Sequence, residues 1–201
     1  MPAQVEPIDL TEWDSSLSSV ADDMNGAPLN VHKLMAHNPS LLNAWWNFRN
    51  YSVNGGSLGP RLGELVILRV GIQLGAWYEW GSHVDRSLRC GLTHSEINAV
   101  LERNIAPLWS PQDALLLQAV DELIGEHQIS AGTLTKLESH FDTAQIMDIM
   151  AIHGMYVILG CMIKTWGLRL DDTVNDRIKS HTTQSDFEAA ATVFRQVKNV
   201  K

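Results

Sequence analysis

The chain has 201 residues, of which 45% are hydrophobic and 19% are charged. That is enough apolar material for one ordinary globular core, and it excludes disordered, collagen-like and low-complexity classes. Acidic residues (23) outnumber Lys and Arg (15), and the formal net charge of −8 argues against a nucleic acid or an anionic membrane as the main partner. The two cysteines, Cys90 and Cys161, form no Cys-x-x-Cys pair. We therefore predict neither a disulfide scaffold nor a structural zinc site, and we expect a reduced, cytoplasmic protein.

Neither a targeting segment nor a membrane span is expected. Residues 1–10 lack the basic and apolar regions of a secretory signal and the Arg-rich pattern of a transit peptide. The most apolar stretch, Ile146 to Ile163, contains Asp148 and His153, and a bilayer span would carry each of these groups at a cost of a few kcal/mol. A helix in a bundle or at a subunit interface can pair them, so we predict a core helix here.

The pattern predicts an all-α protein, since no run of residues alternates with a period of two. Residues 1–28 are polar and predict a peripheral arm with at most one short helix. A strongly apolar helix follows from Asn38-Pro39 and ends before the Asn54-Gly55-Gly56 loop. Two helices are predicted next, one over Leu62–Leu74 with a start signal at Pro60 and one over Ala76–Arg89. A short helix follows that begins with a Thr93 and Glu96 capping box. The remaining helices are predicted over Asp113–Glu126, near Leu134–His140, from Asp142 to Trp166, and from a Ser185 and Glu188 capping box to Arg195.

No linker and no internal repeat of fixed period divides the chain. We predict an N-terminal arm (1–28), a helical domain (29–175) and a C-terminal extension (176–201) whose helix can dock on a neighbour. The whole chain should contain about seven to nine helices.

Glu64 is the odd residue of the helix predicted over Leu62–Leu74. This helix is apolar on nearly every side and should be buried all round. A carboxylate in such surroundings is costly unless it is paired, so Glu64 needs a partner, whether that partner is functional or structural.

Glu79 and His83 lie four residues apart and share one face of the next helix. A bend at Gly75 could bring Glu64 to the same imidazole, and a buried Glu–His pair can share a proton near neutral pH. General acid–base catalysis needs such a group. A Glu and a His at this spacing are also common as a solvated or structural pair, and the spacing alone does not separate the two interpretations.

Several segments resemble the carboxymuconolactone decarboxylase family, which shares the alkylhydroperoxidase D-like fold. The resemblance covers roughly residues 38–171. The segments that carry it are Asn38-Pro39, Leu41-Leu42, Arg61-Leu-Gly-Glu64-Leu-Val-Ile-Leu-Arg69, Tyr78-Glu79-Trp80-Gly-Ser-His83, Gly91-Leu-Thr93, Glu96-Ile97, Tyr156, Trp166-Gly167-Leu168 and Leu170-Asp171. It implies an all-helical bundle that assembles into homotrimers, hexamers or larger rings, with the active pocket near the helix that bears His83.

The chain departs from the thiol-containing members of this fold. Members similar to alkylhydroperoxidase D place Cys-x-x-Cys at the positions that Ala76 and Glu79 occupy here. A thiol peroxidase cycle needs a low-pKa thiolate and a resolving thiol nearby. Cys90 is the only thiol near the helix face that carries Glu79 and His83, and a lone buried cysteine usually serves only as inert packing.

Without these thiols the decarboxylase side of the family is the closer match, and it implies cofactor-free loss of carbon dioxide with reprotonation of an enolate. In this interpretation His83 donates or shuttles the proton, Glu64 orients or charges the imidazole of His83, and Glu79 is a second carboxylate. The residues that we expect to bind a small organic acid or lactone are Tyr78, Trp80, Arg86, Arg69 and Trp46, with the arginines as a bidentate clamp for an anion.

His153 and Cys90 are further candidates, although a histidine on the apolar face of a long helix is more often a core or interface residue than a catalytic one. The remaining histidines show no metal-binding spacing, so no metal or other cofactor is predicted. Three hypotheses stay open: a cofactor-free lyase, a redox protein that uses Cys90, and a non-catalytic oligomer with a small-molecule pocket.

Overall fold

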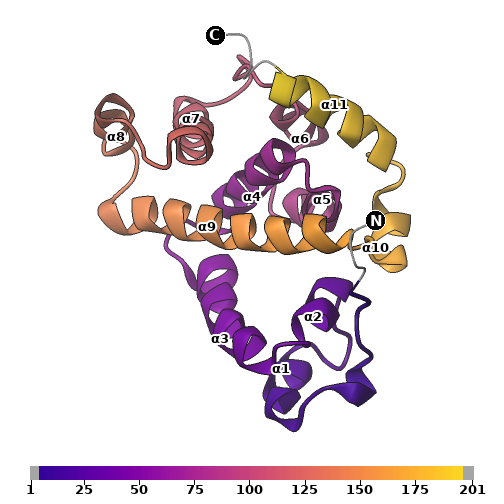
Figure 1. Cartoon of the computed structure of the whole chain (residues 1–201). Helices are drawn as coiled ribbons and strands as arrows, with labels where there is room; N and C mark the ends of the chain where they lie inside the picture. The colour runs from indigo at the N-terminus through magenta and orange to yellow at the C-terminus, as the bar shows by residue number, and fades with distance from the viewer. Residues whose placement is uncertain (1–4, 197–201) are drawn as a thin grey trace.

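The structure, a computed structural model, describes residues 5–196, and over this range it consists of helices and contains no strand (Figure 1). Eleven are α helices: α1 (Ser18–Asp23), α2 (Asn30–Met35), α3 (Pro39–Arg49), α4 (Pro60–Leu74), α5 (Trp77–Arg89), α6 (His94–Val100), α7 (Pro111–Glu126), α8 (Ala131–Leu137), α9 (Thr143–Trp166), α10 (Asp172–Ile178) and α11 (Gln184–Gln196). Two short 3₁₀ helices, η1 (Leu10–Glu12) and η2 (Ser15–Leu17), precede α1, and a π-helical turn, η3 (Asn50–Gly55), follows α3. The predicted all-α class is confirmed.

The count exceeds the expected seven to nine helices because α2 and α10 were not predicted. They have 6 and 7 residues, too few to show a helical period in the sequence. Ser110, Ser130 and Asp142 each accept a backbone hydrogen bond at the start of α7, α8 and α9, and Thr93 forms the predicted capping box. The predicted cap of the last helix is wrong, since Oγ1 of Thr183, not Ser185, accepts from the amide of Asp186 at 3.3 Å.

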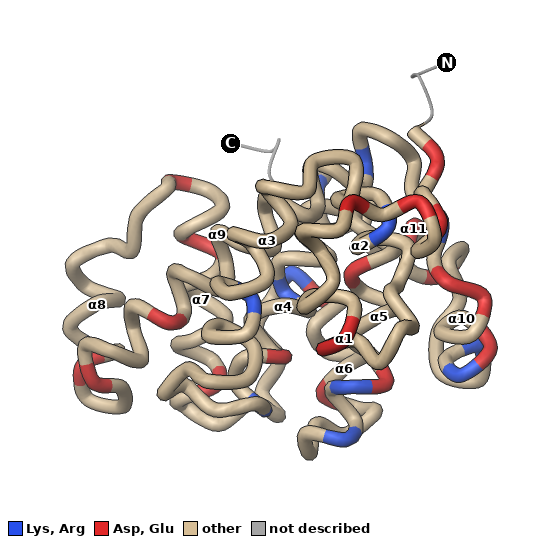
Figure 2. The backbone as a smooth tube through the Cα atoms, turned by 90° about the horizontal axis from the view of Figure 1, so that it is seen from below, with Lys and Arg blue, Asp and Glu red and all other residues tan. Residues whose placement is uncertain are grey.

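Helix α4 lies at the centre of the fold, where it packs against α5, α7, α9 and α11. Its apolar side chains are almost fully buried, as the sequence predicts. In Figure 1, α9 runs across the molecule, with α4 and α5 above it and α1, α2 and α3 below it. Asp and Glu positions are spread along the backbone over many of these elements, with Lys and Arg positions scattered between them (Figure 2).

The turn between α4 and α5 determines which residues of the two helices meet. Gly75 ends α4 with φ of 63°, a left-handed conformation that favours glycine. The amide of Ala76 donates to the carbonyl oxygen of Gly71 at 2.9 Å, which closes the turn. The chain therefore reverses onto α4 instead of continuing as one bent helix, and α5 lies along α4.

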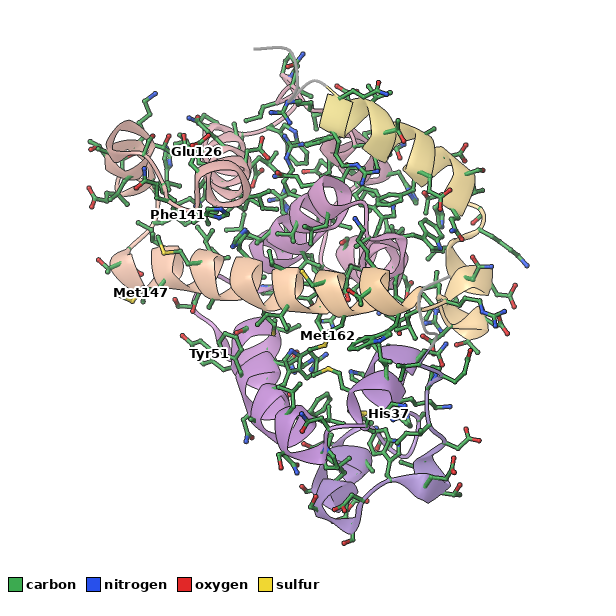
Figure 3. The ribbon with its side chains drawn as sticks, in the orientation of Figure 1. His37, Tyr51, Glu126, Phe141, Met147 and Met162 are labelled. Atoms are coloured by element: carbon green, nitrogen blue, oxygen red, sulfur yellow. The ribbon has the colours of Figure 1, made fainter. Side chains whose placement is uncertain are left out.

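Helix α9 is long and apolar enough, by length and composition, to cross a membrane. Half of its most apolar window is nevertheless buried within the protein. Asp148, 1% exposed, accepts hydrogen bonds from the Tyr51 hydroxyl, from the Ser57 amide and hydroxyl, and from the Leu58 amide. Figure 3 shows Tyr51 beside this helix. These contacts agree with the predicted core helix.

Both ends of the described chain join the same core. Leu17 and Val20, which lie within the predicted arm, are buried in the hydrophobic core. At the other end, Phe187 and Phe194 of α11 are buried where this helix packs on α4 and α5 of its own chain. Residues 1–4 of the predicted arm and 197–201 of the predicted extension lie outside the described residues.

Candidate active site

A buried carboxylate–imidazole pair joins α4 to α5. Oε2 of Glu64 lies 2.6 Å from Nδ1 of His83, and the two residues are 2% and 6% exposed. Burial raises the pKa of Glu64, but the neighbouring His83 and Arg86 outweigh it, so this pKa is below its ordinary value. Burial lowers the pKa of His83, and the charges of Arg86 and Arg49 lower it further, so this pKa is below its ordinary value although Glu64 raises it. At neutral pH Glu64 is therefore ionised, and a neutral His83 donates to it through Nδ1–H.

The second imidazole nitrogen faces α9. Nε2 of His83 lies 3.0 Å from the Tyr156 hydroxyl, which donates to it if Nδ1 carries the proton. The two rings meet edge to face with centroids 5.0 Å apart. Burial, together with the charges of Glu79 and Glu64, keeps the pKa of Tyr156 well above its ordinary value. Tyr156 thus fixes the imidazole from the side opposite Glu64.

Glu79 completes the buried cluster without a close partner. Its Oε2 lies 3.8 Å from Nε2 of His83, and its Oε1 has no hydrogen-bond partner among the described residues. Burial, aided by the charge of Glu64, raises the pKa of Glu79 to about 8. This carboxyl group consequently holds a proton at neutral pH, while Glu64 does not.

Two arginines supply positive charge beside the pair. Nε of Arg86 lies 3.0 Å from Oε1 of Glu64, and the Arg86 side chain is 30% exposed. Arg49, at the end of α3, donates to Oδ1 of Asn50 at 3.1 Å and lies over the Trp46 ring at 5.1 Å. The pKa of Arg49 is below its ordinary value, because burial and the charge of Arg86 lower it more than Tyr156 and Glu64 raise it. Since Arg49 interacts electrostatically with these residues, its charge acts on the same cluster.

A cleft of about 230 Å³ reaches this cluster. Of the predicted site residues only Glu64 and Arg86 line it, so His83 and Glu79 lie behind them relative to the cleft. The other lining residues come from η3, the following loop, α4 and α9: Ser52, Val53, Asn54, Gly56, Leu58, Gly59, Pro60, Gly63, Ile67 and Ile152. Trp46 and Arg49 line a second hollow, of about 490 Å³, which shares Asn54 with the cleft.

Three of the expected substrate-binding residues lie away from the cleft. Arg69 is 1% exposed, and its guanidinium binds both carboxylate oxygens of Asp121 at 2.7 Å and three backbone carbonyl oxygens. Tyr78 donates to Oδ2 of Asp171 at 2.7 Å. Trp80 packs on Phe187 with ring centroids 5.4 Å apart. The structure gives these three side chains contacts that hold helices together.

The two further candidates are not in the Glu64–His83 cluster. His153 is half-buried, and its Nε2 has no hydrogen-bond partner among the described residues. Cys90 is half-buried, and burial together with the charge of Glu64 raises its pKa, the opposite of what a reactive thiolate needs. Over residues 5–196 no group of three His, Cys, Asp or Glu side chains is placed to hold a metal ion.

Sequence reasoning missed Arg49, Tyr156 and the cleft-lining residues of η3. Tyr156 stands 73 residues after His83 and Arg49 stands 34 residues before it, so no local spacing links either one to the imidazole. The one signal in the sequence was Tyr156 itself, which belongs to the segments that carry the family resemblance.

Residues 39–122 match the model of the Carboxymuconolactone decarboxylase family. This match confirms the resemblance seen in the sequence. It spans the whole of α3, α4, α5 and α6, and therefore includes Glu64, Glu79 and His83. A search of curated proteins gives no match.

Solved structures with the same fold are similar over most of the chain. An uncharacterized peroxidase-related protein from Ralstonia eutropha JMP134, with an alkylhydroperoxidase AhpD core, has a TM-score of 0.75 at 17% sequence identity. The match covers 85% of this chain and 93% of the Ralstonia chain. A peroxidase-related protein from Silicibacter sp. TM1040 gives 0.68 at 18% identity, with 86% and 95% covered. The debrominase Bmp8 in complex with 2,3,4-tribromopyrrole gives 0.74 at 14% identity, with 90% and 100% covered. At these identities the likeness shows the AhpD-like fold.

Proposed function

We propose that the protein is a cofactor-free enzyme that acts on a small organic acid or lactone by proton transfer at the Glu64–His83 pair. The observation that carries the proposal is a buried pair with opposed protonation: an ionised Glu64 in contact with a neutral His83, and a protonated Glu79 behind them. Carboxyl groups whose environments push their pKa values apart are typical of acid–base sites.

Glu64 meets the substrate in this proposal because it lines the cleft. It accepts a proton from a carbon next to a carbonyl group, or returns one to the enolate that remains after loss of carbon dioxide. His83 exchanges protons with Glu64 through Nδ1, and Tyr156 holds the imidazole in the orientation that this requires. Glu79, whose Oε2 lies 3.8 Å from Nε2, supplies a proton to this nitrogen when the Tyr156 hydroxyl turns away from it. The reaction is then a lyase or decarboxylase step, or an isomerisation through the same enolate.

The charges of the site favour an anionic substrate. Arg86 and Arg49 supply two positive charges, whereas at neutral pH Glu64 supplies one negative charge and Glu79 none. A carboxylate in the cleft would therefore balance the site, and the exposed part of Arg86 is available to bind it.

Turnover of a panel of small oxo acids and lactones, followed by carbon dioxide release and product analysis, tests the proposal. We expect wild-type activity that His83→Gln and Glu64→Gln abolish while the helical circular dichroism is retained. His140→Gln, which changes an exposed histidine, is the matched control and should stay active. A panel that binds without reacting, in wild type and variants alike, would instead indicate a non-catalytic small-molecule-binding protein.

We further propose a homo-oligomer, a trimer or hexamer, in the cytoplasm. The outer side of α9 supports this assembly, since Met147, Met150 and Ile158 are 63%, 41% and 48% exposed there. Met147 is labelled at this helix in Figure 3. Light scattering after size-exclusion chromatography measures the mass, and Met147→Glu combined with Ile158→Glu should lower it. A monomeric wild type would contradict the proposal.

A further inference from the structure

One residue that lines the cleft has a buried hydroxyl group without a hydrogen-bond partner. Ser52 is 5% exposed, and its Oγ has no partner among the described residues. The residue belongs to η3 and lines the same cleft as Glu64 and Arg86. Buried hydroxyl groups in proteins are nearly always hydrogen-bonded, so an exception in a cleft needs an explanation.

Ser52 lies in a π-helical turn that Asp148 holds in place. A serine in an α helix can donate to the carbonyl oxygen one turn earlier, but η3 is a π-helical turn with a wider hydrogen-bonding pattern. Asp148 holds the segment on both sides of Ser52, through the Tyr51 hydroxyl at 2.8 Å and the Ser57 amide at 2.6 Å. Ser52 is therefore held at the wall of the cleft.

We infer that Ser52 is a substrate-binding residue whose hydroxyl donates a hydrogen bond to a carbonyl oxygen of the substrate, while Arg86 binds a carboxylate of the same molecule. The inference rests on the proposed function and narrows its substrate class to acids that also carry a ketone or lactone carbonyl. When Glu64 takes a proton from the carbon next to this carbonyl, the electron pair of the broken C–H bond moves toward the carbonyl oxygen. A donor already in place stabilises the enolate that forms.

Two five-carbon acids test this assignment by binding alone. Levulinate carries a ketone and a carboxylate, and pentanoate has the same chain without the ketone. We expect wild type to bind levulinate about fivefold more tightly than pentanoate, the value of one net hydrogen bond. Titration calorimetry of the full chain should show that Ser52→Ala removes this preference and leaves pentanoate binding unchanged.

Ser87→Ala is the matched control. Ser87 is also buried with an unpartnered Oγ, but it does not line the cleft, so its removal should leave the preference for levulinate intact. Equal affinity of wild type for the two acids, or a preference that persists in Ser52→Ala, overturns the assignment of Ser52. The proposed function survives that result if Arg86→Gln weakens the binding of both acids. If wild type binds neither acid, the organic-acid site fails and the assignment of Ser52 fails with it.

Discussion

Glu79 gives the most quantitative prediction. Its pKa is about 8 in the folded protein against an ordinary value of 4.5. A carboxyl group with a raised folded pKa favours folding below the unfolded pKa, and this contribution is lost as the pH rises toward the folded pKa. Between pH 4.5 and 7 the difference is 7 − 4.5 = 2.5 units, and at 1.36 kcal/mol per unit the wild type loses about 3 kcal/mol through this group.

Glu79→Gln removes the titration and keeps the shape of the side chain. We therefore expect the free energy of unfolding of Glu79→Gln, relative to wild type, to rise by about 3 kcal/mol between pH 4.5 and 7 and to level off above pH 8. Urea unfolding at a fixed protein concentration, repeated across this pH range, measures the difference and keeps assembly equal in both proteins.

Glu126→Gln is the control for the substitution itself, since it changes an exposed carboxyl group at the end of α7, labelled in Figure 3. No comparable rise is expected there. A flat difference for Glu79→Gln over the same pH range would refute the reasoning, because Glu79 would then titrate equally in the folded and unfolded chains.

Three further predictions concern stability, and urea unfolding measures each. Asp148→Asn removes the ionised acceptor that Tyr51 and the Ser57 amide share, and should cost about 2 kcal/mol; an unchanged free energy would show that this contact does not hold η3. Arg69→Met removes the charged partner of Asp121, which keeps its hydrogen bond from Gln73, and leaves three carbonyl oxygens without their donor. It should cost about 3 kcal/mol, and a stabilised variant would mean that apolar packing compensates. Thr183→Ala should lower the free energy of unfolding by about 1 kcal/mol and Ser185→Ala by less. A larger loss for Ser185→Ala would show that Ser185 caps the helix, as the sequence predicts.

Much of the fold follows from local sequence signals. Apolar periodicity predicts α4, α7 and α9, and local signals mark where they start: Pro60 for α4 and side-chain caps for α7 and α9. Helices α2 and α10 could not be predicted in this way. They are short, and tertiary packing stabilises them, for example the buried Val174 and Ile178 of α10.

The candidate site was predictable where helical spacing placed two residues on one face, as for Glu79 and His83, and where one residue contradicted its surroundings. Glu64 in an apolar helix required a partner, and the structure supplies His83 at 2.6 Å. Arg69 met the same criterion, but its partner is Asp121, because the sequence does not show which neighbour a buried charge will find. The pairing of Tyr156 with His83 depends on how α9 crosses α5, which no local pattern specifies.

In the proposed reaction Glu64 and His83 move protons to and from a carbon atom of the substrate. Solvent exchange tests this most directly: small oxo acids are incubated with wild type in heavy water, and deuterium at the carbon next to the carbonyl is followed by NMR. We predict exchange catalysed by wild type and by His140→Gln, and none by folded Glu64→Gln or His83→Gln. Exchange at the same rate in all four proteins, or binding of these acids by wild type without exchange or carbon dioxide release, would contradict the account.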